Sequence, residues 1–240
     1  MTKPKIIAMI PARIGSERLK YKNLRMLLGK PVIAHVIDAA KNADIFDRIV
    51  LNSDDQVFEK IAGRYDIDFY ARPRELGSSE AKSDDVVVDF MGHFPGDILV
   101  WVNPIAPLQR PGEIADVINY FIAEELDSLI TVKTEQVHCL FDGSPLNFSD
   151  KGLFAKTQDL MPVQSMVYSI MMWRYDNFLT HYNEHGYALL SGKVGYFPVH
   201  RDSTVILKYE EDLRMAEAIL SARDGDTAAP SYDPVVEDLN

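Results

Sequence analysis

Short apolar runs alternate with amphipathic segments along the first half of the chain. Each apolar run ends in a polar or proline-containing loop, and each segment after it repeats its apolar residues at helical spacing. Strands that alternate with helical patterns of about 10 to 15 residues indicate parallel pairing through right-handed crossovers. The alternation therefore predicts an α/β fold of three layers, with a mostly parallel sheet between two layers of helices.

The expected elements follow from these patterns. Strands are predicted at 5–10, 48–55, 66–73, 97–104, 127–133 and near 203–209. Helices are predicted at 30–43, from Val57 onward, and at 84–94, 110–124 and 210–222. The residues after Val132 form shorter, aromatic segments with turn residues such as Asp142-Gly143, which favours a small antiparallel excursion at about 134–180.

Composition sets the number of domains and the compartment that we expect. With 47% apolar residues the chain can bury one large core, so residues 1–222 are predicted to form a single domain. Residues 223–240 are rich in acids and contain two prolines, which predicts a flexible acidic tail. No apolar run reaches the length of about 18 residues that a membrane span needs, and none at the start resembles a signal peptide. We therefore expect a cytoplasmic protein without a membrane partner.

Positive charge is concentrated near the start of an otherwise acidic chain. The net charge is −11, yet residues 1–30 carry eight basic side chains and one acidic one. Most of this charge follows the first predicted strand, in "PARIGSERLKYKN", where Gly15 permits close approach of an anion and Ser16 offers a hydroxyl group. Such a local concentration points to a small polyanion and not to a nucleic acid, which would need a broad basic face. The chain lacks both GxxxxGK[ST] and GxGxxG, so neither a Walker loop nor a dinucleotide loop is expected.

The stretch "IPARIGSERLKYKNLRMLLGKPVIAHVIDAA" resembles the opening motif of the acylneuraminate (CMP-sialic acid) cytidylyltransferase family, which is related to other ulosonic-acid cytidylyltransferases. The likeness continues through "VLNSDD", "ARPRELGSSEAKSDDVVVDF", "DILVWVNPIAPLQRPGEIADVI", "TQDLMPV" and "EEDLRMAEAIL". It implies a Rossmann-like nucleotidyltransferase fold with a dimerisation excursion, and hence a homodimer. It also implies transfer of CMP from CTP to an anionic acceptor, with release of pyrophosphate.

The resemblance assigns roles to individual residues. Nucleotide binding falls to residues of the first loop and to two residues further along, namely Ala12, Arg13, Gly15, Ser16, Lys22, Asn23, Arg72 and Ser83. Acceptor binding falls to Asn103, and to Lys156 and Gln158, which in the family reach across a dimer. Such a site acts by positioning and charge neutralisation, and Arg13 and Lys22 are expected to be catalytic in this sense.

The family's Mg²⁺ site is altered in this sequence. The family holds the metal with two aspartates before the last helix, and this chain has Ile206 and Lys208 at those positions. Neither side chain offers the oxygen ligands that Mg²⁺ requires, so no metal-binding residue is assigned. Either Lys208 supplies fixed positive charge as a third catalytic residue, or nucleotidyl transfer has been lost.

The acceptor motifs also differ, and three functions remain open. The family's "PTSPLR" is "PIAPLQ" here, and Val167 and Tyr168 replace an Asn-Gly pair. Loss of these polar groups and of space predicts an acceptor other than sialic acid, such as another ulosonic acid or a phosphonate. The alternatives to a cytidylyltransferase are a non-catalytic relative that binds a nucleotide or sugar, and a nucleotidyltransferase for another base or acceptor.

Overall fold

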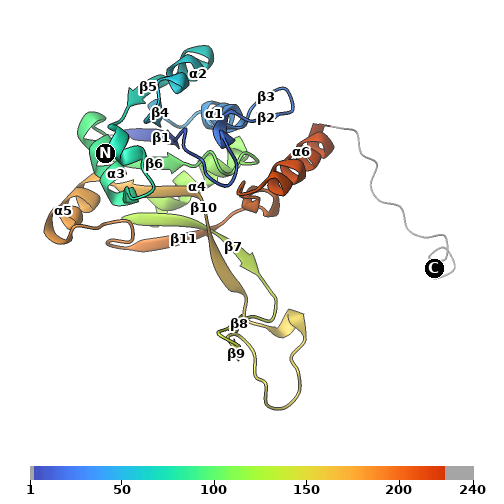
Figure 1. The fold of residues 1–240 in the computed structure, drawn as a ribbon. Helices are drawn as coiled ribbons and strands as arrows, with labels where there is room; N and C mark the ends of the chain where they lie inside the picture. Colours follow the sequence, from blue (N-terminus) through green and yellow to red (C-terminus); the bar gives the residue numbers. More distant parts are fainter. Residues whose placement is uncertain (1–2, 225–240) are drawn as a thin grey trace.

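The computed structural model describes residues 3–224, and they form a seven-stranded sheet with helices on both faces (Figure 1). The strand order is β11-β7-β10-β6-β1-β4-β5. The strands are β1 Ile6–Ala12, β4 Arg48–Ser53, β5 Asp68–Ala71, β6 Ile98–Val102, β7 Ser128–Glu135, β10 Val163–Arg174 and β11 Val194–Pro198. Only β10 runs antiparallel to its neighbours in this sheet. The mostly parallel α/β sheet predicted from the sequence is confirmed.

The two layers of helices follow from the alternation of side chains along the strands. In β1, Ile6, Ala8 and Ile10 face one core, and Ile7 and Met9 face the other. The first core is covered by α1 Val32–Asn42, α2 Val57–Tyr65 and α4 Pro111–Ala123, and the second by α3 Ser83–His93 and α5 Tyr175–His185. Both faces of the central strands are therefore buried, which is why their sequences are continuously apolar.

The chain order places a switch point beside β1. From β1 the chain proceeds to β4 and β5 on one side, and then returns to pair β6 on the other side of β1. In open α/β sheets the crevice at such a point, beyond the carboxyl ends of the strands, is where ligands bind. The loops that follow Ala12 and Val102 lie at this edge.

The last predicted strand is wrong. Residues 201–204 form a short 3₁₀ helix, and the following residues up to Lys208 form no strand. The edge of β7 is already occupied by β11, which the sequence analysis did not predict. The strand β11 contains Gly195 and Pro198, and a Cβ atom at Gly195 would lie 2.2 Å from Leu126 Cδ1. The glycine that looks like a strand breaker is thus required for close packing.

Two segments lie outside the sheet. Between β7 and β10 the chain projects as an arm, residues 136–162, which carries the hairpin of β8 Leu140–Phe141 and β9 Ser144–Pro145 (Figure 1). The second half of β10 returns to the central sheet, so the projecting part is narrower than the predicted 134–180 excursion.

The C-terminal helix α6 Glu210–Asp224 packs over the short hairpin of β2 Met26–Leu27 and β3 Lys30–Pro31. It includes the first two residues of the predicted 223–240 tail, and the remainder of that prediction lies outside the described residues. Within residues 3–224, no helix is both long enough and apolar enough to cross a membrane.

Candidate functional site

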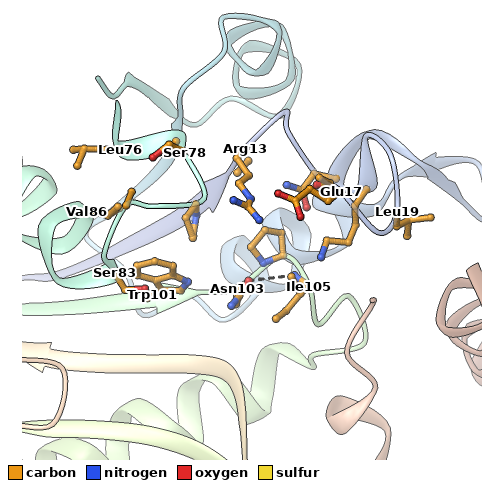
Figure 2. Close-up of a pocket in the computed structure, with 18 of the residues that line it drawn as sticks. Arg13, Glu17, Leu19, Leu76, Ser78, Ser83, Val86, Trp101, Asn103 and Ile105 are labelled. Atoms are coloured by element: carbon orange, nitrogen blue, oxygen red, sulfur yellow. Dashed lines mark hydrogen bonds between the residues drawn. The ribbon is translucent and has the colours of Figure 1, made fainter. Parts of the chain in front are cut away.

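A cavity of about 290 Å³ opens at the carboxyl ends of β1 and β6 (Figure 2). Its walls come from the loop after β1, from the segment between β5 and α3, from the end of β6, and from the segment before α6. Sequence-predicted site residues make up much of the lining, namely Ala12, Arg13, Ser16, Lys22, Asn23, Arg72, Ser83, Asn103 and Lys208. The fold thus brings together residues that are up to about two hundred positions apart in the chain.

The loop after β1 is held by its own backbone. Ser16 N donates to Ile14 O at 2.9 Å, and Leu24 N donates to Tyr21 O at 2.7 Å. Leu19 is buried and fixes the middle of the loop to the body of the protein. The loop therefore presents Arg13 and Lys22 toward the cavity. Gly15 is not among the lining residues, and its φ angle is an ordinary one, so the structure gives it no special contact.

Lys22 is the most perturbed cation of the site. It is half-buried, and Nζ donates a hydrogen bond to Leu207 O at 3.0 Å. Burial, together with the charges of Arg18, Arg13 and Lys208, lowers the pKa of Lys22 to about 8, and only Asp212 acts in the opposite direction. Positive groups are thus crowded together here, and an anion would relieve their mutual repulsion.

Arg72 and Asn23 line the cavity with buried polar atoms that lack a partner. Arg72 is only 7% exposed; its Nη2 donates to Ala12 O at 3.2 Å and lies 3.9 Å from Asp54 Oδ1, while its Nε has no hydrogen bond among the described residues. Asn23 is 4% exposed, and its Oδ1 has no hydrogen bond there either. Buried polar groups are normally satisfied, so Arg72 Nε is suited to donate to a ligand and Asn23 Oδ1 to accept from one.

Asp54 and Asp55 directly follow β4, next to the cavity. Asp55 Oδ1 accepts from Val57 N at 2.8 Å, at the first residue of α2. Asp54 stands beside Arg72 and belongs to the shallower depression next to the cavity. The pair therefore serves local structure and the orientation of Arg72.

Trp101 is a lining residue that the sequence analysis missed. Its indole Nε1 is buried and has no hydrogen bond among the described residues. The ring packs edge-on against Trp173 with centroids 6.3 Å apart. In Figure 2, Trp101 and Arg13 approach the cavity from opposite sides. The sequence did offer a signal for Trp101: it stands two residues before the predicted site residue Asn103, and side chains at i and i+2 along an extended segment point to the same side.

Two predicted site residues lie elsewhere. Lys156 and Gln158 are exposed on the arm and do not line the cavity. Arg110, which follows the segment "PIAPLQ", pairs with Asp202 at 2.9 Å and does not line the cavity either. Within one chain, Asn103 is therefore the one residue expected to bind the acceptor that lines the cavity among the described residues. Its Oδ1 accepts from Ile105 N at 3.4 Å, and its amide nitrogen has no hydrogen bond among the described residues.

The donor set of the cavity does not fit a protein-held Mg²⁺ ion. Five lining residues are cationic, Arg13, Arg18, Lys22, Arg72 and Lys208, and one, Glu17, is a carboxylate. Among residues 3–224 no three histidine, cysteine or acidic side chains are grouped as metal ligands. Ile206 does not line the cavity, and Lys208 contributes a cation in place of an oxygen ligand.

Comparison with known proteins adds sequence and structural relatives. A family model described as "Cytidylyltransferase" matches residues 7–214. An N-acylneuraminate cytidylyltransferase of Escherichia coli O18:K1:H7 is 30% identical over 153 residues, which is 61% of this chain and 36% of that protein. A pseudaminic acid cytidylyltransferase of Campylobacter jejuni strain 81-176 is 42% identical over 84 residues, or 35% of this chain and 36% of that one. The matched regions thus span little more than a third of the length of these curated relatives.

Solved structures agree on the fold. A CMP:2-keto-3-deoxy-manno-octonic acid synthetase complexed with CTP superposes with a TM-score of 0.71 at 16% identity, covering 91% of this chain and 99% of that one. A 4-diphosphocytidyl-2C-methyl-D-erythritol synthase from Anaerococcus prevotii gives a TM-score of 0.60 at 14% identity, covering 90% and 98%. The Rossmann-like nucleotidyltransferase fold expected from the sequence is confirmed.

Proposed function

This chain belongs to the cytidylyltransferase family, and from that premise we propose that it transfers CMP from CTP to an anionic acceptor of the ulosonic acid type. In this reaction an acceptor hydroxyl oxygen forms a bond to the α-phosphorus of CTP, and the bond from that phosphorus to the β-phosphate bridging oxygen breaks. Pyrophosphate leaves, and the hydroxyl proton passes to solvent. No covalent enzyme intermediate is required.

One observation carries the proposal: five cationic side chains converge on one cavity in a chain whose net charge is −11. A triphosphate needs several charged donors at once, and a preorganised set of them stabilises the charge that develops as pyrophosphate leaves. Arg13, Ser16, Lys22 and Asn23 are the proposed triphosphate ligands. Arg72 and Ser83, which lie in the segment from the end of β5 to the start of α3, are the proposed contacts of the nucleoside.

The acceptor is proposed to lie between Asn103 and Trp101. Trp101 lies in β6 and Asn103 directly follows it, and each carries an N–H group that has no hydrogen bond among the described residues. An anionic acceptor offers oxygen atoms to such donors. The resemblance places Lys156 and Gln158 at positions that reach across a dimer in the family. The arm that carries them here projects away from the central sheet (Figure 1).

We further propose that the arm forms a homodimer. Its large apolar side chains are strongly exposed, among them Phe141 at 74%, Leu153 at 99% and Met161 at 75%. Contiguous exposed apolar groups of this size mark interaction surfaces. A second copy would cover them and bring its Lys156 and Gln158 toward the acceptor. The use of CTP fits the cytoplasmic location expected from the sequence.

Two assays test the proposed function. In competition binding, CTP should displace a fluorescent nucleotide more effectively than UTP, ATP or GTP; equal displacement by all four would indicate another base. Pyrophosphate release from CTP should appear when ulosonic acids or phosphonates are supplied. Binding of CTP with no release from any acceptor would favour the non-catalytic relative.

A further inference from the structure

Lys208 occupies a fixed place at the mouth of the cavity. The residue before it, Leu207, is fully buried; its N–H donates to Ile105 O at 2.8 Å, and its carbonyl oxygen accepts from Lys22 Nζ. The N–H of Lys208 itself donates to Asp212 Oδ2 at 2.7 Å. The backbone is therefore held on both sides of Lys208, while its side chain lines the cavity and has no ion pair among the described residues.

Two of the three acidic residues that follow Lys208, Glu210 and Asp212, are engaged in other contacts. Glu210 Oε1 lies 2.5 Å from Arg25 Nη2, and Asp212 Oδ2 accepts from the N–H groups of Lys208 and Tyr209 at the start of α6. The bonds of Asp212 are the usual task of an acid in a first helical turn, where it accepts from free N–H groups, and Glu210 is held in an ion pair. They leave Glu17 as the one carboxylate in the described lining of the cavity.

We propose that the Lys208 ammonium group stands in place of a divalent cation held by protein carboxylates, so that the site binds the free nucleoside triphosphate as well as its metal complex. This inference rests on the proposed function, because it assigns the chemical form of the nucleotide that the same site accepts. A compact ammonium group with three donors can contact phosphate oxygens as a point charge.

The neighbourhood of Lys22 supports a shared anion. Lys208 is among the charges that lower the pKa of Lys22, together with Arg18 and Arg13, and Asp212 is the acid that opposes them. Cationic side chains that repel one another remain close together only because the fold holds them there. Their repulsion is offset when a group with several negative charges lies between them.

The test measures CTP binding by calorimetry in EDTA and in Mg²⁺, on the full chain. The wild type should bind CTP in EDTA with an affinity within about threefold of that in Mg²⁺. Lys208→Ala should weaken binding in EDTA by about ten- to a hundredfold, since a hydrogen-bonded charge is lost. Lys208→Arg should remain within about threefold of the wild type.

Three more variants sharpen the result. Lys208→Asp restores an oxygen ligand, so its binding should be weakest in EDTA and should recover in part when Mg²⁺ is added. The matched control is Lys20→Ala, which removes an exposed lysine that lies in the loop after β1 and does not line the cavity, and it should bind as the wild type does. Glu17→Gln should leave the ratio of the two wild-type affinities unchanged. Thermal unfolding of every variant checks that the fold is kept.

The outcomes separate the two proposals. Wild-type binding that requires Mg²⁺, or a Glu17→Gln variant that loses a Mg²⁺-dependent gain, would overturn the role of Lys208 and leave the proposed function standing. Equal binding by Lys208→Ala and the wild type in EDTA would do the same. Absence of CTP binding under both conditions would contradict the proposed function itself.

Discussion

Lys22 and Leu207 are joined by a hydrogen bond of 3.0 Å from Nζ to the carbonyl oxygen, across 185 positions of the chain. The bond ties the loop after β1 to the segment that carries Lys208 and leads into α6. Because Leu207 is also bonded to Ile105, three parts of the cavity wall meet at this residue. A displacement of the loop after β1 would therefore also displace the segment that carries Lys208.

The lowered pKa of Lys22 gives the site a pH dependence. A lysine is charged below its pKa, so the ammonium group of Lys22 is present below about pH 8 and is lost as the pH rises through that value. CTP affinity should therefore fall between pH 7 and pH 9, and calorimetry in buffers of different ionisation enthalpy should detect proton uptake on binding. Lys22→Met should bind more weakly and should lose this part of the pH dependence. An affinity that stays flat over this range would contradict the assignment.

The same shift affects stability with a defined sign. The pKa of Lys22 is lower in the folded chain than its ordinary value of 10.5, so the unfolded state binds more protons between these two values. The contribution of Lys22 to the free energy of unfolding should therefore rise as the pH increases from about 8 to 10.5. Urea denaturation of the wild type and Lys22→Met at several pH values measures the difference, which should change in this window and not below it.

Tryptophan fluorescence can report ligand binding from a known position. The chain has two tryptophans: Trp101 lines the cavity, and Trp173 is fully buried in the core. CTP or acceptor should change the emission of the wild type and of Trp173→Phe, whereas Trp101→Phe should lose most of that change. A change that persists in Trp101→Phe would place the ligand elsewhere.

Gly77 has a packing role at the edge of the cavity. A Cβ atom there would lie 2.4 Å from Asp54 Oδ2, so Gly77→Ala should displace Asp54 from Arg72 and destabilise the fold by about 1–3 kcal/mol. Gly63, in the exposed part of α2, has open space around it, and Gly63→Ala should stabilise by about 0.5–1 kcal/mol. Denaturant unfolding of both variants provides the comparison. Equal effects would show that the close contact with Asp54 is not maintained.

Tyr168 adopts a backbone conformation that suits glycine. Its φ angle is +58°, at the irregularity of β10 between Met166 and Met171, and the family has a glycine at this position. The left-handed region costs a residue with a side chain about 1–2 kcal/mol. Tyr168→Gly should therefore be more stable than Tyr168→Ala by about 1 kcal/mol, because both lack the ring and only alanine keeps the strain. A more stable alanine variant would contradict this backbone conformation.

The exposed apolar residues of the arm predict that the protein is a dimer. Light scattering after size exclusion should give the mass of a dimer for the wild type, and a monomer for Leu153→Asp combined with Phe141→Asp. The control is Met215→Asp, which places the same charge on an exposed apolar residue of α6, 54% exposed, and should leave the dimer intact. A wild-type monomer would remove the partner's Lys156 and Gln158 from the account of the acceptor site.

The sequence predicted the elements whose periodicity was unambiguous. The strands β1 and β6 and the helices α1 and α4 have strongly apolar faces bounded by proline, and they lie where expected. The strand β11 was missed because its turn-forming residues, Gly195 and Pro198, are tolerated at a sheet edge. The predicted strand near 203–209 is wrong, and the place beside β7 is taken by β11.

The candidate site was predictable where charge and spacing agreed. Arg13, Lys22 and Asn23 follow one strand closely, so their convergence is a local property of the loop. Trp101 was hidden because an aromatic residue in an apolar strand looks like core. The burial that lowers the pKa of Lys22, and the added charge of Lys208, depend on how the segment before α6 packs against the loop after β1, which only the fold decides.

The most direct test of the account is mass spectrometry of the product formed from CTP and a panel of ulosonic acids. The account predicts a conjugate of CMP with one acceptor, in an amount equal to the pyrophosphate released, and loss of that conjugate in Lys22→Met. Hydrolysis of CTP without a conjugate, or a conjugate that forms equally well from UTP, would contradict the assignment of this chain as a cytidylyltransferase acting on an anionic sugar.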